Sequence, residues 1–316
     1  MAAARKPAPT AAPGDSKTPW AHNKERGNMA ALQLMSWIAL HLGRGISRGV
    51  LLFVMAYFYL SSSSARKASR EFLSRIPHQS TGRLAVFKHL HAFGAVTLDR
   101  IYFLNGRLDL FNISVNDPNN LALGTASSGA GMFLMGAHMG SFECVRGIAR
   151  DHPQLKMVLL MYEENARNIK KLLNAINPDA QQDIIGLGRP GAMLAVKEQL
   201  GQGALIGVLA DRSLDDTGSV LVSLLGSAAA FPSGPFRMAA MLGHPVYFMT
   251  GTYHGGNRYT IHLDLIMDAA SIAANREQAS QRALERYVQL IEQHCLAAPY
   301  NWFNFFDFWQ TNAQRP

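Results

Sequence analysis

The 316-residue sequence has few charged residues and few cysteines. Charged side chains make up 16% of the chain, below the roughly 25% typical of soluble domains, which favours a large buried fraction or contact with a membrane surface. The two cysteines, Cys144 and Cys295, exclude a disulfide scaffold and a cysteine zinc site, and free cysteines suit the reducing cytosol. Apolar residues make up 48%, which is enough for a sizeable core and excludes global disorder.

The sequence also lacks the motifs of several common enzyme classes. It contains no GxxxxGK[ST], HExxH or GxSxG, which excludes a P-loop, a zincin site and a nucleophile elbow. A membrane-spanning helix needs about 20 consecutive apolar residues, whereas the unbroken apolar run from Val50 to Leu60 has 11. A cleaved signal peptide is not expected either, because the apolar segment starts too far from residue 1.

Positive charge is concentrated in the first quarter of the chain. Residues 1–75 hold 11 Lys and Arg against 3 Asp and Glu, whereas residues 76–316 hold 19 of each, so the net charge of +8 belongs to the first segment. A nucleic-acid-binding protein would usually spread its cations over the folded domain. A basic segment beside an apolar one favours attraction to anionic lipid, with a solvated tail and helix-flanking charges as the alternative.

These patterns divide the chain into three parts. Residues 1–20 are predicted to be a disordered basic tail, residues 21–75 an apolar and basic membrane anchor, and residues 76–316 a single α/β domain. In the anchor, Arg44 and Arg48 interrupt the apolar sequence and share one helix face. This arrangement favours a helix lying in the membrane interface, with a tilted span as the alternative, and the cations favour the cytoplasmic leaflet.

Apolar runs alternate with helical patterns through the rest of the chain. The predicted strands are 131–137, 157–161, 183–187, 204–210, 220–225, 246–253 and 259–266, and the predicted helices are 141–150, 163–176, 190–200, 235–242 and 276–296. The last two strands flank the turn 255–257, which predicts a hairpin. The alternation predicts an α/β fold with a single mixed, partly parallel sheet flanked by helices, preceded by the membrane-associated helical segment.

A G-x-G-x-x-G pattern covers Gly186 to Gly191, after a predicted strand and before a predicted helix. Asp211 follows 20 residues later, as in dinucleotide-binding units where an acidic residue binds the ribose. Against this interpretation, the strand before the glycines is short, and Pro190 lacks an amide hydrogen. A glycine-rich structural turn is favoured, and an enzyme with a nucleotide cofactor stays an alternative.

His138 and Glu143 form a second candidate site, in the sequence His-Met-Gly-Ser-Phe-Glu. His138 falls at the carboxyl end of a predicted buried strand, where α/β sheets place their ligands. If Glu143 lies in the first turn of the next helix, its carboxylate can fix one imidazole tautomer, and the other ring nitrogen can take a proton from a hydroxyl. The first-turn amides would offer an anion site beside the ring. The alternative is a strand-end histidine satisfied by the backbone.

The stretch GAHMGSFE (136–143) resembles the H-x4-[DE] signature of the lysophospholipid acyltransferase superfamily. Within that superfamily the chain is most similar to the branch of lipid A lauroyl and myristoyl acyltransferases and their relatives. The further stretches that carry the resemblance are ARKASREFL (65–73), GLGRPGAMLAVKEQLGQGALIGVLADR (186–212), LLGSAAAFPSGPFRMAAMLGHPVYF (224–248) and the aromatic C-terminus.

The resemblance implies transfer of a fatty acyl chain from acyl carrier protein or coenzyme A, as co-substrate, to a hydroxyl of a lipid or glycolipid. It implies a location at the cytoplasmic face of the bacterial inner membrane, with no metal or other cofactor. By position, His138 is the base and Glu143 its orienting carboxylate. Asp211 and Arg212 match a second block that tends to read Asp-Gln, from which Arg212 departs, and both are expected to bind substrate.

Several other residues leave alternatives open. Arg146 and Arg189 are expected to bind a phosphate or carrier group, with surface ion pairs as the alternative. The aromatic residues in 302–309 could line an acyl channel, lie at the membrane interface or pack in the core. A non-catalytic lipid-binding module at the membrane surface is the alternative function, and in that case His138 would be replaceable.

Overall fold

The computed structural model describes residues 29–145, 155–162, 173, 176–177, 183–188, 190–212 and 218–309. Four sequence predictions fall wholly or mostly outside these residues: the basic tail 1–20, the candidate site residues Arg146 and Arg189, and the helix 163–176.

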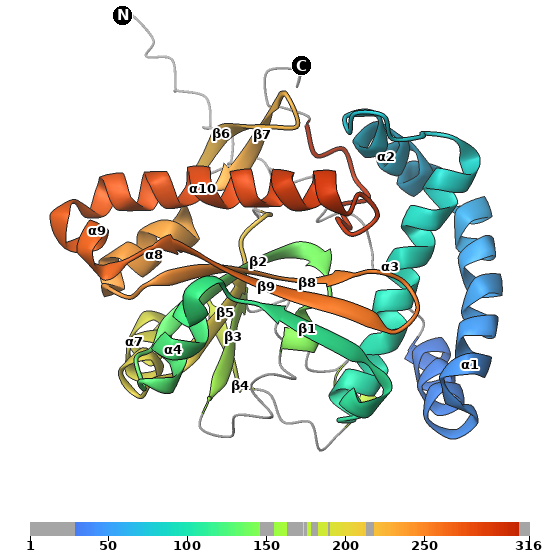
Figure 1. Ribbon diagram of the computed structural model, residues 1–316, viewed down its shortest axis with the longest axis horizontal. Coiled ribbons are helices and arrows are strands. Elements are labelled where there is room, and N and C mark those ends of the chain that lie inside the picture. Colours follow the sequence, from blue (N-terminus) through green and yellow to red (C-terminus); the bar gives the residue numbers. More distant parts are fainter. Residues whose placement is uncertain are drawn as a thin grey trace, which may run out of the picture.

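One seven-stranded sheet organises the described part of the chain (Figure 1). Its strands, in spatial order, are β1 (Asn112–Asn116), β9 (Arg258–Met267), β8 (Val246–Tyr253), β2 (Met132–Gly140), β5 (Leu205–Leu209), β3 (Met157–Tyr162) and β4 (Asp183–Leu187). All neighbours pair in parallel except β8 and β9, which form an antiparallel pair. The predicted mixed, partly parallel sheet and its terminal hairpin are therefore confirmed.

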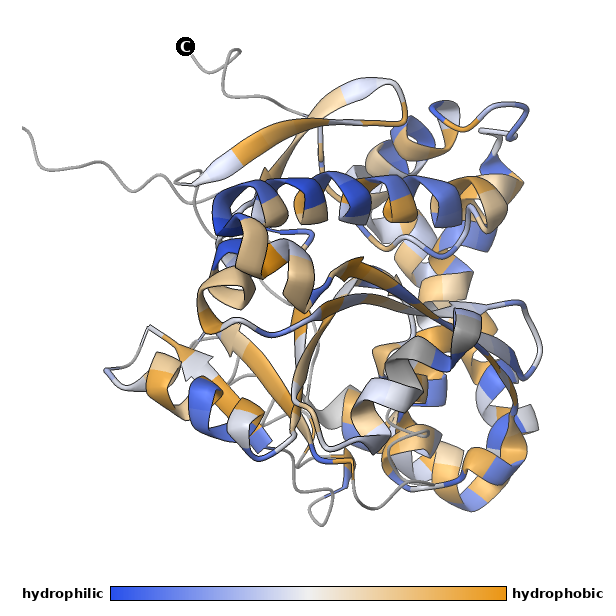
Figure 2. Cartoon of the chain, turned by 60° about the vertical axis from the view of Figure 1, so that its left-hand side comes forward, coloured by the Kyte–Doolittle hydropathy of each residue, from blue (hydrophilic) through white to orange (hydrophobic). Residues whose placement is uncertain are grey.

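Helices cover both faces of this sheet, which explains why its central strands are apolar on both sides. The helices of the sheet region are α4 (Leu121–Ser127), α7 (Ala192–Gly201), α8 (Gly234–Leu242), α9 (Ala269–Ala274) and α10 (Arg276–Ala297). Figure 1 shows α10 along one side of β8 and β9, with α4 and α7 on the other side. Figure 2 shows the strands of the sheet as largely hydrophobic and much of α10 as hydrophilic.

Two strands were not predicted from the sequence. β1 has the sequence NISVN, lies at the sheet edge and is largely exposed, so it carries little hydrophobic signal. β7 (Ser227–Pro232) pairs with β6 (Ser219–Leu224) in a separate two-stranded sheet. The alanines of β7 are weak strand formers, which hides its pairing with β6.

The N-terminal part of the described chain is helical and bent. It forms α1 (Met29–Ser61), α2 (Ser63–Ser74) and α3 (Arg83–Leu104). Gly43 has φ +83° inside α1 and breaks it into two helical arms, because a residue in this backbone region cannot continue a right-handed helix. Figure 1 shows α1 beside α3 at the right of the molecule. By length and composition, the segment Leu32–Ser61 could cross a membrane, but the bend means that it is not one straight helix.

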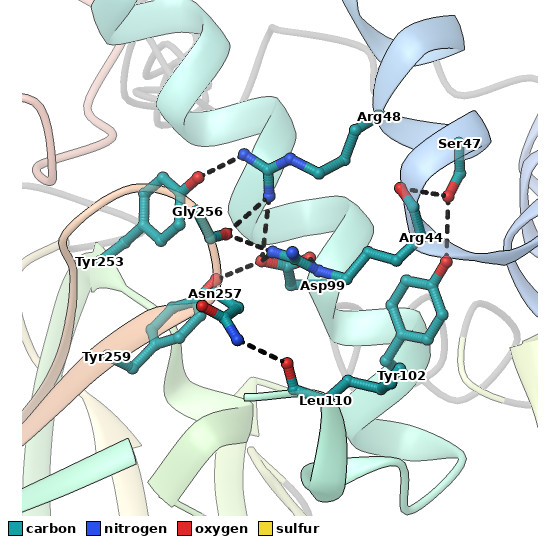
Figure 3. A network of polar contacts seen from close by, with 10 residues as sticks. All are labelled: Arg44, Ser47, Arg48, Asp99, Tyr102, Leu110, Tyr253, Gly256, Asn257 and Tyr259. Atoms are coloured by element: carbon teal, nitrogen blue, oxygen red, sulfur yellow. Dashed lines mark hydrogen bonds and ion pairs between the residues drawn. The ribbon is translucent and has the colours of Figure 1, made fainter. Parts of the chain in front are cut away.

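A buried carboxylate on α3 joins α1 to the turn between β8 and β9 (Figure 3). Asp99 is fully buried and accepts two hydrogen bonds of 2.9 Å from the guanidinium of Arg44. It accepts a third, of 2.8 Å, from the hydroxyl of Tyr259, and Arg48 lies 3.6 Å away. Both arginines also donate to the carbonyl oxygen of Gly256. These five residues, the Asp99 cluster, fix α1 against the sheet.

The Asp99 cluster also corrects the expectation that Arg44 and Arg48 form a basic patch for lipid. Their side chains are only 17% and 22% exposed, because an ionised carboxylate within the protein takes up their charge. What α1 exposes is instead apolar. Its exposed large side chains are Leu34, Trp37, Leu40, Leu42, Ile46, Leu52, Phe53, Val54, Tyr57 and Leu60, here called the α1 apolar face.

Candidate active site

Three parallel strands end at the carboxyl edge of the sheet, where α/β folds place their ligand sites. β2 ends at Gly140, β5 is followed by Asp211, and β8 ends at Tyr253. The pairing of β2 with β8 becomes irregular between Gly136 and Gly140, and such irregularities re-aim side chains. His138 lies in this irregular stretch.

His138 is held by the carboxylate of Asp211. The backbone N–H of His138 donates to Oδ2 at 3.0 Å, and Nδ1 lies 2.8 Å from Oδ1. Because an ionised carboxylate can only accept hydrogen bonds, Nδ1 carries the proton and Nε2 keeps its lone pair. The His138 side chain is 32% exposed, and Nε2 has no hydrogen-bond partner among the described residues. The ring can therefore take a proton from a substrate hydroxyl.

Burial and neighbouring charges set the ionisation of this pair. Burial lowers the pKa of His138, and the positive charge of Arg212 lowers it further, while Asp211 acts in the opposite direction. Burial by itself would raise the pKa of Asp211, but the contacts with His138, Arg212 and Asn304 outweigh it and hold that pKa well below its usual range. At neutral pH the pair is a neutral imidazole beside an ionised carboxylate, which is the state a general base requires.

The partner of His138 is not the predicted one. The sequence predicted that Glu143 orients the ring, but Asp211, which was expected to bind substrate, does so. Glu143 lies beyond the end of β2, in the helical residues 142–145, and its Oε1 is 2.8 Å from Nε of Arg100 on α3. Asp211 instead follows the strand next to β2, and this adjacency of β2 and β5 brings it to the ring. A role of Glu143 in catalysis stays a prediction.

The C-terminal segment 301–304 runs beside the end of β2 and supports His138. The amide of Phe303 donates to the carbonyl oxygen of His138 at 2.7 Å. Trp302 forms an antiparallel bridge with Met139 and is 1% exposed. Of the alternatives for the terminal aromatic residues, core packing therefore applies to Trp302, which serves as part of a short additional strand.

Gly140 allows the chain to turn directly after His138. Its φ is +57°, and a Cβ at this position would lie 2.0 Å from the carbonyl oxygen of Gly251 on β8. Only glycine fits this backbone conformation at so close an approach. The amide of Gly140 donates to Asn301 at 2.8 Å, and the amide of Ser141 donates to Gly251 at 2.8 Å. These bonds fix the end of β2 on both sides.

Arg212 ties the C-terminal segment to the site. Its Nε donates to Oδ1 of Asn304 at 2.6 Å, and Nη2 donates to the carbonyl oxygen of Phe303 at 3.1 Å. The guanidinium also lies over the ring of Phe306, 5.3 Å from its centroid. Burial lowers the pKa of Arg212 to about 10, so it remains charged at neutral pH. Two of its donors hold the protein itself, and substrate binding by Arg212 stays a prediction.

Comparison with known families decides the class of enzyme. The sequence profile of the bacterial lipid A biosynthesis acyltransferases matches residues 118–311, which is more than half of the chain. The chain belongs to this family. It is an acyltransferase, and the resemblance found in the sequence is confirmed. A comparison with curated proteins finds no match.

In this acyltransferase, part of the predicted anion site at the start of helix 142–145 is already occupied. The amides of Gly140 and Ser141 donate to backbone carbonyl oxygens, and the amide of Cys144 lies 3.3 Å from Oγ of Ser141. Through the last contact, Ser141 caps the N-terminus of this helix. Of the first-turn amides expected to face an anion, those of Ser141 and Cys144 are thus bonded within the protein.

Sequence reasoning missed two residues of the acyltransferase site, Arg100 and Asn304. Asn304 is 2% exposed and bridges Asp211 and Arg212. A signal for it existed, because a buried amide within an aromatic segment must find partners. Arg100 had no such signal, since a single arginine on a long helix is usually solvent-exposed.

The glycine pattern and metal binding can be assessed on the same geometry. The acidic residue that a dinucleotide site would need, Asp211, is buried and bonded to His138. Gly191, with φ +83°, precedes the first turn of α7, as the structural-turn interpretation requires. Within the described ranges, no group of three His, Cys, Asp or Glu side chains is placed to hold a metal ion.

Proposed function

We propose that this acyltransferase moves a fatty acyl chain from an acyl carrier protein or coenzyme A thioester to a hydroxyl of a membrane lipid or glycolipid, at the cytoplasmic face of the bacterial inner membrane. The observation that carries the proposal is the 2.8 Å contact of His138 Nδ1 with Asp211, which leaves the lone pair of Nε2 free on a partly exposed ring at the carboxyl edge of the sheet. Membership in a family of lipid acyltransferases supports the reaction class.

The reaction follows from this pair. Nε2 of His138 removes the proton from the acceptor hydroxyl as its oxygen forms a bond to the thioester carbonyl carbon. The carbonyl electrons move to oxygen and form a tetrahedral oxyanion, while Asp211 stabilises the imidazolium. Collapse of the oxyanion breaks the carbon–sulfur bond, and the departing thiolate receives the proton from His138. The products are an ester and a free thiol, and no covalent enzyme intermediate is needed.

The α1 apolar face supports attachment to a membrane, and with it a lipid acceptor. Exposed apolar patches of this kind mark interaction surfaces, and an interfacial helix buries such a face in the lipid headgroup region. The bend at Gly43 and the inward-facing Arg44 and Arg48 favour a helix lying on the membrane over one that spans it.

The test is acyl transfer by His138→Ala, with His244→Ala as a matched control. His244 bonds the carbonyl oxygen of Gly131 at the opposite edge of the sheet, at 2.9 Å. Each protein is given long-chain acyl thioesters of acyl carrier protein or of coenzyme A together with a bacterial lipid extract, and folding is checked by circular dichroism. We expect His138→Ala to lower the rate of acyl transfer by a factor of about 10²–10⁴. His244→Ala should keep the wild-type rate.

Full activity in folded His138→Ala would refute the mechanism. If the protein binds lipid but no variant or wild type transfers an acyl chain, the alternative of a non-catalytic lipid-binding module gains support instead. The ratio of rates with the two thioesters identifies the donor.

A further inference from the structure

We propose that Arg100 on α3 stabilises the oxyanion of the tetrahedral intermediate, and that Glu143 holds Arg100 in place for this purpose. The inference rests on the proposed function, since it concerns the same acyl-transfer site. Arg100 lies outside the residues 118–311 that the family profile matches.

The reaction requires a donor that the His138–Asp211 pair does not supply. When the hydroxyl attacks the thioester, negative charge develops on the carbonyl oxygen, and enzymes place fixed hydrogen-bond donors where this charge forms. The amides of Gly140, Ser141 and Cys144 are bonded within the protein. They are therefore not available to an oxyanion beside His138, which leaves the amides of Phe142 and Glu143 and the guanidinium of Arg100 as the donors to compare.

Arg100 has the geometry of such a donor. Its Nε is buried and lies 2.8 Å from Oε1 of Glu143, in an ion pair rather than a well-aligned hydrogen bond. The side chain as a whole is 29% exposed. No hydrogen bond from either η nitrogen to an acceptor is found among the residues that the structure describes. The guanidinium is thus held from one side and open on the other.

Arg100 lies at the end of β2 that carries the catalytic ring, because its ion-pair partner Glu143 is in the helical residues that follow this strand. The charge of Arg100 is one of those that lower the pKa of His138, and its partner Glu143 lies five residues from His138 in the chain. The Glu143 side chain is only 12% exposed. Its carboxylate neutralises the guanidinium in the resting enzyme, so the η nitrogens can meet a new negative charge without reorganisation.

Arg212, the other arginine near His138, is less suited to this role. Its Nε and Nη2 donate to Asn304 and to the carbonyl oxygen of Phe303. These bonds hold the C-terminal segment and would have to break for both donors to reach a substrate oxygen. Arg100 needs no such change.

The support of Arg100 is rigid, as an oxyanion donor requires. The preceding residue, Asp99, is the centre of the cluster in Figure 3, where Arg44 and Tyr259 hold α3 against α1 and β9. One turn of α3 therefore carries a structural carboxylate and, next to it, the proposed donor.

The experiment compares Arg100→Met with Arg107→Met. Arg107 lies just beyond α3 and pairs with Asp109 at 3.2 Å, with both side chains at least half exposed. With the acyl thioesters and lipid extract used above, we expect Arg100→Met to lower kcat by about 10²–10³ with little change in KM, because the lost interaction exists only in the transition state. Arg107→Met should match the wild type.

A second variant covers the case in which Arg100→Met leaves Glu143 buried and unpaired and so fails to fold. The double variant Arg100→Met/Glu143→Gln removes both charges, and we expect it to fold and to keep the low kcat of Arg100→Met. Added ethylguanidinium should restore activity to Arg100→Ala but not to His138→Ala, which separates a missing donor from a missing base.

Wild-type kcat in the double variant would overturn the inference, since Arg100 would then serve only to neutralise Glu143. The same holds for unchanged kcat in folded Arg100→Met, which would leave the amides of Phe142 and Glu143 as the donors. Either result is compatible with loss of activity in His138→Ala, so the proposed function is tested separately from Arg100.

Discussion

At the scale of single residues, the site depends on which nitrogen of His138 carries the proton. Asp211 contacts both the backbone amide and Nδ1 of His138, so it fixes the position of the chain and the tautomer of the ring together. A carboxylate in this position also stabilises the imidazolium that forms when the ring takes up a proton. A change at Asp211 should therefore affect catalysis more than stability.

We predict that Asp211→Asn lowers kcat by about 10²–10⁴, because a neutral amide neither fixes the Nδ1 proton nor stabilises the imidazolium. Steady-state kinetics and a thermal melt measure the two effects. The matched control is Asp183→Asn, since Asp183 is an exposed carboxylate that pairs with Lys156 at 3.3 Å on the edge strand β4. Wild-type kcat in Asp211→Asn would show that Asp211 only supports the fold.

The pH dependence of kcat/KM gives a second prediction at this scale. The pKa of His138 is lowered from its ordinary value of 6.5, first by burial and then by Arg212. A base is active when deprotonated, so activity should persist above this pKa and fall as the pH drops below it. We expect the acidic limb to be centred below pH 6.5 in rate measurements from pH 4.5 to 8. A limb centred above pH 7 would contradict this assignment.

At the scale of elements, His89 connects three segments that support the site. It lies on α3, is fully buried, and bonds Ser69 of α2 at 2.9 Å and the carbonyl oxygen of Trp302 at 2.8 Å. Burial lowers the pKa of His89 to about 4, and the bond to Trp302 only partly opposes this. The neutral ring is therefore part of the folded structure that holds the C-terminal segment beside His138.

We predict that this histidine makes the protein less stable in acid. The unfolded chain takes up a proton near pH 6.5 and the folded chain only near pH 4, so stability is retained above pH 6.5 and falls as the pH drops between these values. The loss is at most about 3 kcal/mol. Urea unfolding at a series of pH values should show a weaker dependence in His89→Gln than in the wild type.

His41→Gln, the same substitution at an exposed position of α1, provides the matched control. Burial also lowers the pKa of His294 to about 4. Because His294 is present in the wild type and in both variants, its contribution to the pH dependence cancels in the comparison. Equal slopes in His89→Gln and the wild type would contradict the prediction.

The elements that could be predicted from the sequence are those whose burial is visible along the chain. β5 is an apolar run, β2 and β8 each begin with four apolar residues, and α10 repeats its apolar residues at helical spacing. β1 escaped prediction because it is short and polar. Its five residues gain stability by pairing with β9, a contact across more than 140 residues that no local pattern encodes.

The candidate site also contains one residue that local sequence predicts and contacts that only the packing of the elements determines. His138 could be predicted, because its place at the end of an apolar run follows from local sequence. Its pairing with Asp211 depends on β2 lying next to β5, and the pairing of Glu143 with Arg100 depends on how α3 packs. Spacing along the chain favoured Glu143 as the partner of His138. The order of strands in the sheet instead places Asp211, which follows β5, beside His138 on β2.

At the scale of the whole molecule, the α1 apolar face should determine where the protein resides. We predict that the triple variant Phe53→Ser/Tyr57→Ser/Leu60→Ser binds anionic lipid vesicles more than tenfold more weakly than the wild type, since each buried apolar side chain contributes about 1.5–3 kcal/mol. The three side chains are at least 73% exposed, so the fold should tolerate the change. Vesicle sedimentation measures the difference.

The control for this variant replaces three exposed apolar side chains elsewhere, as Val220→Ser/Leu221→Ser/Met241→Ser, and it should bind like the wild type. High salt should not release the wild-type protein, because screening weakens only electrostatic attachment. Complete release by salt, or equal binding of both triple variants, would argue against the α1 apolar face as the contact.

The Asp99 cluster has a geometrical consequence for the choice of acceptor. One carboxylate ties the helix with the α1 apolar face to the β8–β9 turn, at the same edge of the sheet as His138. If α1 rests in the lipid interface, the height of the imidazole above the bilayer is then set by the protein and not by the substrate. The enzyme would then acylate only hydroxyls that lie at this fixed height above the bilayer. Two lipids with similar headgroups would therefore differ as acceptors according to how far their hydroxyls stand above the membrane.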